Sequence, residues 1–126
     1  MKWPGRSGVA LETGWILAGR CPDGAPVRFV FGTSELRARP GGLTIGRHPA
    51  LSERVLDEPS VSRRHARLAL DGGVLVVEDL SSLNGTLIDD RPLAPFAPRV
   101  LAAGQTLSLG AVDLEVEALA EDEAGA

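Results

Sequence analysis

The sequence predicts an all-β protein built as a sandwich of short strands, and three observations support this class. Fifteen glycines and nine prolines among 126 residues imply many turns. Apolar and acidic residues alternate over residues 112–118, as they do in a half-buried strand. The sequence has no helical period of convincing length and no internal repeat. We therefore expect strands joined by tight turns around a core of Leu, Val, Ile and Ala.

The expected strands follow in order, each bounded by residues that favour turns. A turn-rich segment at 21–26 separates the first two strands, and Pro40-Gly41-Gly42 precedes the third. Asp71-Gly72-Gly73 predicts a hairpin, and Asn84-Gly85 is a second hairpin signal. The strand at 74–77 is wholly apolar, which predicts burial on both faces. The expected strands are residues 14–19, 27–31, 43–45, 65–70, 74–77, 86–88, 106–109 and 112–118.

Two stretches between these strands lack a regular pattern. Residues 48–60 contain two prolines and no clean period, and a loop of this length inside a compact domain is often functional. Its charged residues are expected to rim the site and influence ligand choice: Glu53, Arg54, Asp57 and Glu58. Residues 92–98 contain three prolines and are expected to be irregular.

The composition fits one soluble domain, which we assign to residues 14–118. An apolar fraction of 44% is enough for a core, and 24% charged residues is typical of a globular protein. Residues 1–13 are expected to form a flexible leader or an edge segment. Residues 119–126 are expected to form a disordered acidic tail.

Charge and cysteine content exclude several classes of function. A net charge of −4 argues against general attraction to nucleic acid or to an anionic membrane. Cys21 is the only cysteine, so neither an internal disulfide nor a cysteine-based zinc site is expected. No apolar run has the length of a membrane span, and residues 14–19 are too short for the core of a secretory signal. We expect a cytoplasmic protein with no membrane insertion, metal or cofactor.

Three polar clusters stand at junctions between expected strands and loops: Gly46-Arg47, Ser62 to His65, and Asn84-Gly85-Thr86. A phosphorylated side chain carries a charge of about −1.5 to −2 and three strong acceptor oxygens. Arg47 supplies planar donors that match phosphate geometry, and Gly46 removes a side chain where the backbone turns to aim it. Ser62 supplies a hydroxyl and a backbone amide, and Arg63 adds charge. The carboxamide of Asn84 suits the peptide backbone beside a phosphate.

Taken singly, each cluster has an ordinary interpretation. Arg47 alone fits a surface arginine, and residues 62–65 alone fit a turn before a basic strand. Asn84-Gly85 alone fits a type I′ turn, in which both residues take positive φ. The order and spacing of all three on an all-β pattern favour a binding site.

The sequence strongly resembles the forkhead-associated (FHA) family. The matching segments are residues 43–47 (LTIGR), 61–66 (VSRRHA) and 80–86 (LSSLNGT), followed by a short strand, an Asp89-Asp90 turn and a basic residue. The resemblance spans roughly residues 14–118. It implies a β-sandwich of about eleven strands whose loops at one end bind phosphothreonine peptides.

The resemblance also implies a role for each matching residue. Arg47 and Ser62 would hold the phosphate, with Arg63 supporting it or touching the flanking peptide. Asn84 would bind the peptide main chain just after the phosphorylated residue. Structural support would come from Gly46, His65 and Gly85, and further flanking contacts from Arg64, Leu83 and Thr86.

The implied function is that of an adaptor without enzymatic activity. It would recruit a partner phosphorylated on threonine by a Ser/Thr protein kinase, and the high Ala, Gly, Arg and Leu content suggests a bacterial source. The main rival is a module on the same fold that binds unphosphorylated protein or itself. A hydrolase using Ser62, His65 and Asp79 has weak support, because no nucleophile elbow or oxyanion donor is evident. A nucleic-acid interface at Arg63, Arg64 and Arg67 lacks neighbouring aromatic residues.

Overall fold

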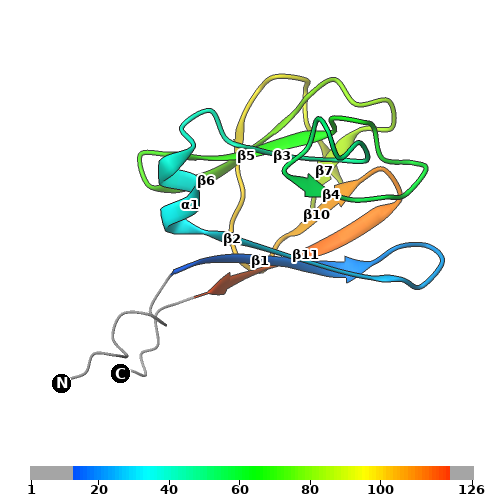
Figure 1. The fold of residues 1–126 in the computed structure, drawn as a ribbon, viewed down its shortest axis with the longest axis horizontal. Helices are drawn as coiled ribbons and strands as arrows, with labels where there is room; N and C mark the ends of the chain where they lie inside the picture. Colours follow the sequence, from blue (N-terminus) through cyan, green and yellow to red (C-terminus); the bar gives the residue numbers. More distant parts are fainter. Residues whose placement is uncertain (1–12, 120–126) are drawn as a thin grey trace.

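The protein folds as a sandwich of two β-sheets, which confirms the predicted class (Figure 1). This computed structural model describes residues 13–119, so most of the expected leader and tail, residues 1–12 and 120–126, lie outside the described residues. The described part contains eleven strands and one helix. They are β1 (Gly14–Arg20), β2 (Pro26–Gly32), α1 (Thr33–Ala38), β3 (Leu43–Gly46), β4 (Arg54–Val55), β5 (Ala66–Asp71), β6 (Val74–Asp79), β7 (Thr86–Ile88), β8 (Arg91–Pro92), β9 (Arg99–Val100), β10 (Thr106–Leu109) and β11 (Val112–Leu119).

The strands divide between a six-stranded and a five-stranded sheet. The larger sheet has the order β2-β1-β11-β10-β7-β8, and the smaller has the order β4-β3-β5-β6-β9. Neighbouring strands are antiparallel except β3 and β4, which are parallel. Figure 1 shows β1, β2 and β11 in one layer and β3, β5 and β6 in the other, with α1 at one end of the molecule.

The short helix α1 was not expected from the sequence. It spans six residues between β2 of one sheet and β3 of the other, and it buries Leu36, which is 1% exposed. A helix of so few residues contributes only one inward position, so it leaves no 3.6-residue period in the sequence.

Two of the predicted turns are confirmed, and one is of a different kind. Gly72 and Gly73 join β5 to β6 with φ of 59° and 84°, and Asp89 and Asp90 join β7 to β8 with φ of 48° and 67°. Both pairs have the positive φ of a type I′ turn. The hairpin interpretation of Asn84-Gly85 is wrong, because this segment connects β6 to β7, which belong to different sheets.

The core lies between the sheets and follows the alternation seen in the sequence. In β11 the inward residues are buried as expected: Val112, Leu114 and Val116. The expectation that residues 74–77 are buried on both faces is wrong. Leu75 and Val77 lie in the core, but Val74 is 47% exposed and Val76 is only partly covered, because their face of the five-stranded sheet points away from the other sheet.

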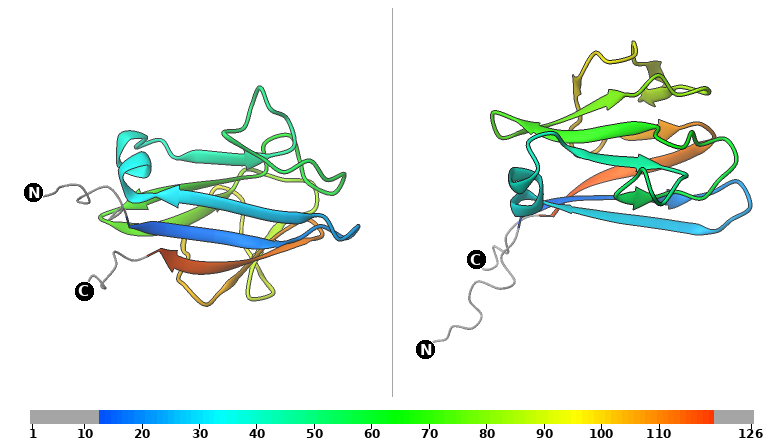
Figure 2. Two further views of the ribbon diagram at one scale, coloured as in Figure 1. Left: turned by 60° about the horizontal axis from the view of Figure 1, so that its bottom comes forward. Right: turned by 45° about the horizontal axis from the view of Figure 1, so that its top comes forward.

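The loops that carry the three polar clusters gather at the end of the sandwich opposite α1 (Figure 2). Strand β3 ends there, and both β5 and β7 begin there. This convergence places segments that are about 40 residues apart in the chain around one rim.

Candidate functional site

Backbone and side-chain hydrogen bonds join the three clusters. The N–H of Arg47 donates to the carbonyl of Ser62 at 2.9 Å, and the N–H of His48 donates to the carbonyl of Arg63 at 3.2 Å. These bonds attach the segment after β3 to the segment before β5. The loop of the third cluster is attached through the N–H of Leu83, which donates to Oγ of Ser62 at 3.0 Å. The structure therefore brings together all three segments that the sequence singled out.

The guanidinium of Arg47 is hydrogen-bonded at Nε, whereas its terminal nitrogens are exposed. Its Nε–H donates to the carbonyl of Val61 at 2.9 Å, while the side chain as a whole is exposed. Within residues 13–119, its two terminal nitrogens donate no hydrogen bond and form no ion pair. The fork is thus oriented before any ligand arrives, and its free donors face solvent.

Gly46 is required by a close approach between two segments. A Cβ at this position would lie 2.1 Å from the carbonyl oxygen of Arg63 and 2.5 Å from Oγ of Ser52. The same hydroxyl donates to the Arg63 carbonyl at 2.8 Å. The sequence identified this glycine and predicted that it permits a turn that directs Arg47. The structure gives a different reason, which is that a side chain has no space here.

Ser62 offers its hydroxyl but not its backbone amide. The N–H of Ser62 donates to Nδ1 of His65 at 3.0 Å, so the expectation of a free amide donor is wrong. The hydroxyl oxygen accepts the N–H of Leu83, and an amide N–H can only donate. The hydroxyl hydrogen of Ser62 therefore remains available to an acceptor from outside.

His65 fixes the positions of two of the loops from inside the protein. Its side chain is fully buried; Nδ1 accepts the N–H of Ser62, so Nε2 carries the proton that bonds the carbonyl of Gly85 at 2.8 Å. Burial lowers the pKa of His65, against opposing effects of the Gly85 carbonyl and of Asp79. The ring is thus held neutral, in the tautomer that both bonds require.

Asn84 lies exposed at the rim with one end of its carboxamide fixed. One N–H of its Nδ2 donates to the carbonyl of Ser60 at 2.8 Å, which leaves Oδ1 free to accept a hydrogen bond. Gly85 has a φ of 91°, a conformation that glycine adopts without strain, whereas Asn84 does not have positive φ. A carboxamide oriented in this way can accept an N–H from an extended chain laid beside it.

The remaining predicted residues divide between surface and core. Arg63 and Arg64 are exposed, and neither belongs to the three ion pairs found in the described part of the chain. Leu83 is 88% exposed. The expectation that Thr86 makes a flanking contact is wrong, because Thr86 is fully buried and its hydroxyl donates to the carboxylate of Asp79 at 2.6 Å.

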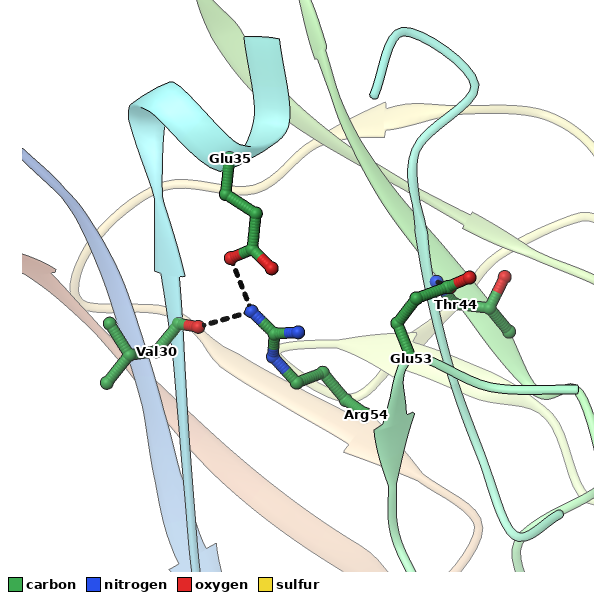
Figure 3. A network of polar contacts seen from close by, with 5 residues as sticks. All are labelled: Val30, Glu35, Thr44, Glu53 and Arg54. Carbon is green, nitrogen blue, oxygen red and sulfur yellow. Dashed lines mark hydrogen bonds and ion pairs between the residues drawn. The ribbon is translucent and has the colours of Figure 1, made fainter. Parts of the chain in front are cut away.

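The loop at 48–60 does not present all its charges to the site. Figure 3 shows the guanidinium of Arg54 directed to α1 and β2, where it donates to Glu35 at 2.5 Å and to the carbonyl of Val30 at 2.8 Å. Glu53 turns to β3 and accepts the N–H of Thr44 at 2.7 Å, a bond that lowers the pKa of this carboxyl. The expectation that Glu53 and Arg54 rim the site is therefore wrong.

Ser60 and Glu58 form a junction whose role the sequence did not reveal. Ser60 donates through both its N–H and its hydroxyl to Glu58, and its Oγ accepts the N–H of Ala111 at 2.8 Å. Its carbonyl accepts the Asn84 side chain. A serine two residues after a glutamate is a common local pattern, so the sequence does not single it out. The folded structure shows that Ser60 and Glu58 connect three loops.

The geometry does not support the hydrolase alternative. Both ring nitrogens of His65 are bonded to backbone groups, and neither contacts Oγ of Ser62. The carboxylate of Asp79 binds the hydroxyls of Ser82 and Thr86. Within the described residues, no group of three or more His, Cys, Asp or Glu side chains is arranged to hold a metal ion. The same part of the chain has no helix that is long and apolar enough to cross a membrane.

Comparisons with known proteins agree with this arrangement. The family model described as the FHA domain matches residues 43–110. The glycogen accumulation regulator GarA of Mycolicibacterium smegmatis is 45% identical over 65 residues, which cover 52% of this chain and 39% of that protein. The chain therefore spans well under half the length of this curated relative.

Solved structures extend the similarity to most of the chain. An FHA structure from a study of phosphothreonine-dependent FHA domain interactions has a TM-score of 0.62 at 28% identity and covers 84% of this chain and 95% of that one. The FHA domain of FhaA, solved in complex with the intracellular domain of Rv3910, has a TM-score of 0.61 at 28% identity, with 83% and 99% covered. With a sandwich of eleven strands and all three motifs joined at one rim, the chain belongs to the FHA domain family.

Proposed function

We propose that this protein binds phosphothreonine peptides at the rim formed by Arg47, Ser62 and Asn84. It would act as an adaptor that recruits a partner phosphorylated by a Ser/Thr protein kinase and would carry out no chemistry of its own. The proposed binding unit is residues 14–118, and the protein is expected to act in the cytoplasm. One observation carries the proposal: Arg47, whose guanidinium is bonded at Nε and free at its terminal nitrogens, is joined through its backbone N–H to Ser62, whose hydroxyl hydrogen is unused.

The phosphate is the ligand group that these donors suit best. Arg47 supplies two terminal nitrogens of a fork that is already anchored to Val61, and Ser62 supplies a neutral donor for another phosphate oxygen. Arg63 and Arg64, which lack carboxylate partners within the described residues, add positive charge around the same point. A group carrying about −1.5 to −2 charges would offset this local excess.

Asn84 would read the main chain of the peptide. Its free Oδ1 can accept a backbone N–H, and Ser60 holds the carboxamide in that orientation. A contact of this kind is independent of the peptide sequence, so it would position any phosphopeptide in the same register.

The relatives support this assignment through what their names state. One structural neighbour comes from a study of phosphothreonine-dependent interactions of FHA domains, and another contains an FHA domain bound to a second protein. GarA is named as a regulator of glycogen accumulation. A regulatory binding role for this chain agrees with these names, and its own partner is to be found by experiment.

The decisive experiment compares matched peptides by isothermal titration calorimetry. The peptides are identical except that the central residue is phosphothreonine, threonine or glutamate. A charge-assisted hydrogen bond contributes about 1.5–3 kcal/mol, and several are lost without the phosphate. We expect binding in the micromolar range to weaken by about 100-fold or more for threonine and glutamate. Equal affinity for all three peptides would contradict the proposal and support a phosphate-independent interaction module on the same fold.

A further inference from the structure

Leu83 is the most exposed large apolar residue in the described part of the chain. The residue is 88% exposed, compared with 60% for Phe96 and 58% for Val100. Single apolar residues on a surface are common and need no special explanation. The position of this leucine is what makes it informative, because its N–H is bonded to Ser62 and the next residue is Asn84.

The backbone of Leu83 is fixed to the hydroxyl that we assign to phosphate binding. Its N–H donates to Oγ of Ser62 at 3.0 Å. Since the N–Cα bond is about 1.46 Å long, Cα of Leu83 lies within roughly 4.5 Å of that oxygen. A phosphate oxygen accepting from the hydroxyl would lie about 2.7 Å from it on the solvent side.

The loop around Leu83 cannot easily move this side chain out of the way. Ser82 donates through its N–H and its hydroxyl to the carboxylate of Asp79, which is 2% exposed. The N–H of Gly85 in turn donates to Oγ of Ser82 at 3.0 Å. The segment is therefore attached on both sides of Leu83. Because its backbone is already ordered, binding of a ligand at Leu83 would lose little further backbone entropy.

A peptide bound as proposed would lie close to Leu83. Its phosphate would contact Ser62, and its main chain just after the phosphothreonine would contact Asn84. Leu83 lies between these two contacts in sequence and is attached to the first. An extended chain advances about 3.3 Å per residue, so the nearest peptide side chains are those one or two positions after the phosphothreonine.

We propose that Leu83 selects an apolar side chain at the first or second position after the phosphothreonine. The inference rests on the proposed function, because it needs a phosphopeptide in this register. Leu83 offers no donor or acceptor through its side chain, so its contribution would come from removing apolar surface from water. An apolar partner would gain from this contact, and a polar one would lose hydration without a hydrogen bond in return.

The test uses a set of phosphothreonine peptides that differ only at these two positions. Each position carries leucine, phenylalanine, serine, glutamine or glutamate in turn, and affinities are measured for the full chain and for variants. We expect the wild-type protein to bind the best apolar peptide about tenfold more tightly than the serine peptide. Leu83→Ser should remove this preference, and Leu83→Met should restore most of it. Val74→Ser is the matched control, because Val74 is 47% exposed at the β5–β6 hairpin, remote from the site.

The possible outcomes distinguish the role of Leu83 from phosphopeptide binding itself. A wild-type protein that binds phosphopeptides with no apolar preference would overturn the role of Leu83 and leave the proposed function intact. The same holds if Leu83→Ser leaves the flanking preference unchanged and alters only the affinity ratio between a phosphothreonine peptide and its phosphoserine counterpart, which is titrated alongside, since the leucine would then contact the threonine methyl group. A preference for glutamate that survives Leu83→Ser would assign selection to Arg63 and Arg64. Failure of the wild-type protein to bind any phosphopeptide would overturn both proposals.

Discussion

Arg47 and Arg54 lie seven residues apart on the segment between β3 and β5, yet the structure uses them in opposite ways. Arg54 directs its guanidinium inward, where it donates to Glu35 and to the carbonyl of Val30, and its side chain is 20% exposed. It also lies over the ring of Phe31, with 4.7 Å between the guanidinium carbon and the ring centroid. Arg47 makes one bond through Nε and leaves its terminal nitrogens open to solvent.

On the same segment, Arg54 therefore contributes to stability and Arg47 is available for binding. Arg54 connects the loop to α1 and β2, and its charge is compensated within the protein (Figure 3). The charge of Arg47 has no such partner within residues 13–119, so an external anion can supply one. A loop that is attached through one arginine can present the other in a fixed direction. Variants of the two residues should therefore have distinct effects.

The largest effect is expected from Arg47→Ala in binding. Loss of the guanidinium removes charge-assisted bonds of about 1.5–3 kcal/mol each, so phosphopeptide affinity should fall by about 100-fold or more. The melting temperature should stay nearly unchanged, because the side chain is exposed. Calorimetric titration and thermal unfolding of the same sample measure both quantities. Arg99→Ala is the control, since Arg99 is exposed on β9 and should affect neither. Retained affinity in Arg47→Ala would remove this residue from the site.

The next effect is expected from Arg54→Ala in stability. The variant loses a charged hydrogen bond to Glu35, a bond to the Val30 carbonyl and the contact with Phe31. We expect the free energy of unfolding to fall by about 2–3 kcal/mol, after allowance for partial solvent screening, with a melting temperature lower by roughly 10 °C. Folded protein should bind phosphopeptide within a few-fold of wild type. Arg37→Ala in α1, an exposed arginine, should unfold at the wild-type temperature. A large loss of affinity without loss of stability would mean that Arg54 acts at the site itself.

A smaller effect is expected from Asn84→Ala. The free Oδ1 and the bond to Ser60 are both lost, and affinity should fall by about tenfold, the equivalent of one hydrogen bond. Because Asn84 is proposed to contact main chain, the factor should be similar for peptides of different flanking sequence. Titration of three unrelated phosphopeptides measures this. A loss confined to one peptide would show that Asn84 contacts a side chain instead.

The smallest effect concerns pH and the neutral ring of His65. Its pKa is lowered in the folded state by burial, so in mildly acid solution the unfolded chain binds more protons than the folded chain. The stabilising contribution is complete above the unfolded pKa of about 6.5 and is lost as pH falls through the folded value. Protonated Nδ1 could no longer accept the N–H of Ser62. Urea unfolding between pH 7.5 and 5.5 should show decreasing stability, and His48→Gln should retain the trend. A flat profile would contradict the buried neutral assignment.

The comparison of the two arginines also shows how far the sequence could predict the molecule. The strands of regular alternation, such as β11, and the turn at Gly72-Gly73 depend on neighbouring residues, so the sequence predicts them. Strands β4, β8 and β9 have two residues each and are formed by pairing with distant segments, so they leave no pattern.

The candidate site could be predicted as a set of segments but not as a set of bonds. The three motifs do converge, as their resemblance to the FHA family implied. The direction of each side chain depends on contacts made far along the chain: Arg54 meets Glu35 nineteen residues before it, and Leu83 meets Ser62 twenty-one residues before it. Thr86 illustrates the same limit, because an alternating strand does not reveal which face is buried until its neighbours are placed.

The most direct measurement is a crystal structure of the protein with a bound phosphothreonine peptide. We expect phosphate oxygens within about 3 Å of the terminal nitrogens of Arg47 and of Oγ of Ser62, with Arg54 still bound to Glu35. A phosphate held elsewhere, or an Arg47 side chain that turns away from it, would show that Arg47 and Ser62 do not form the phosphate site.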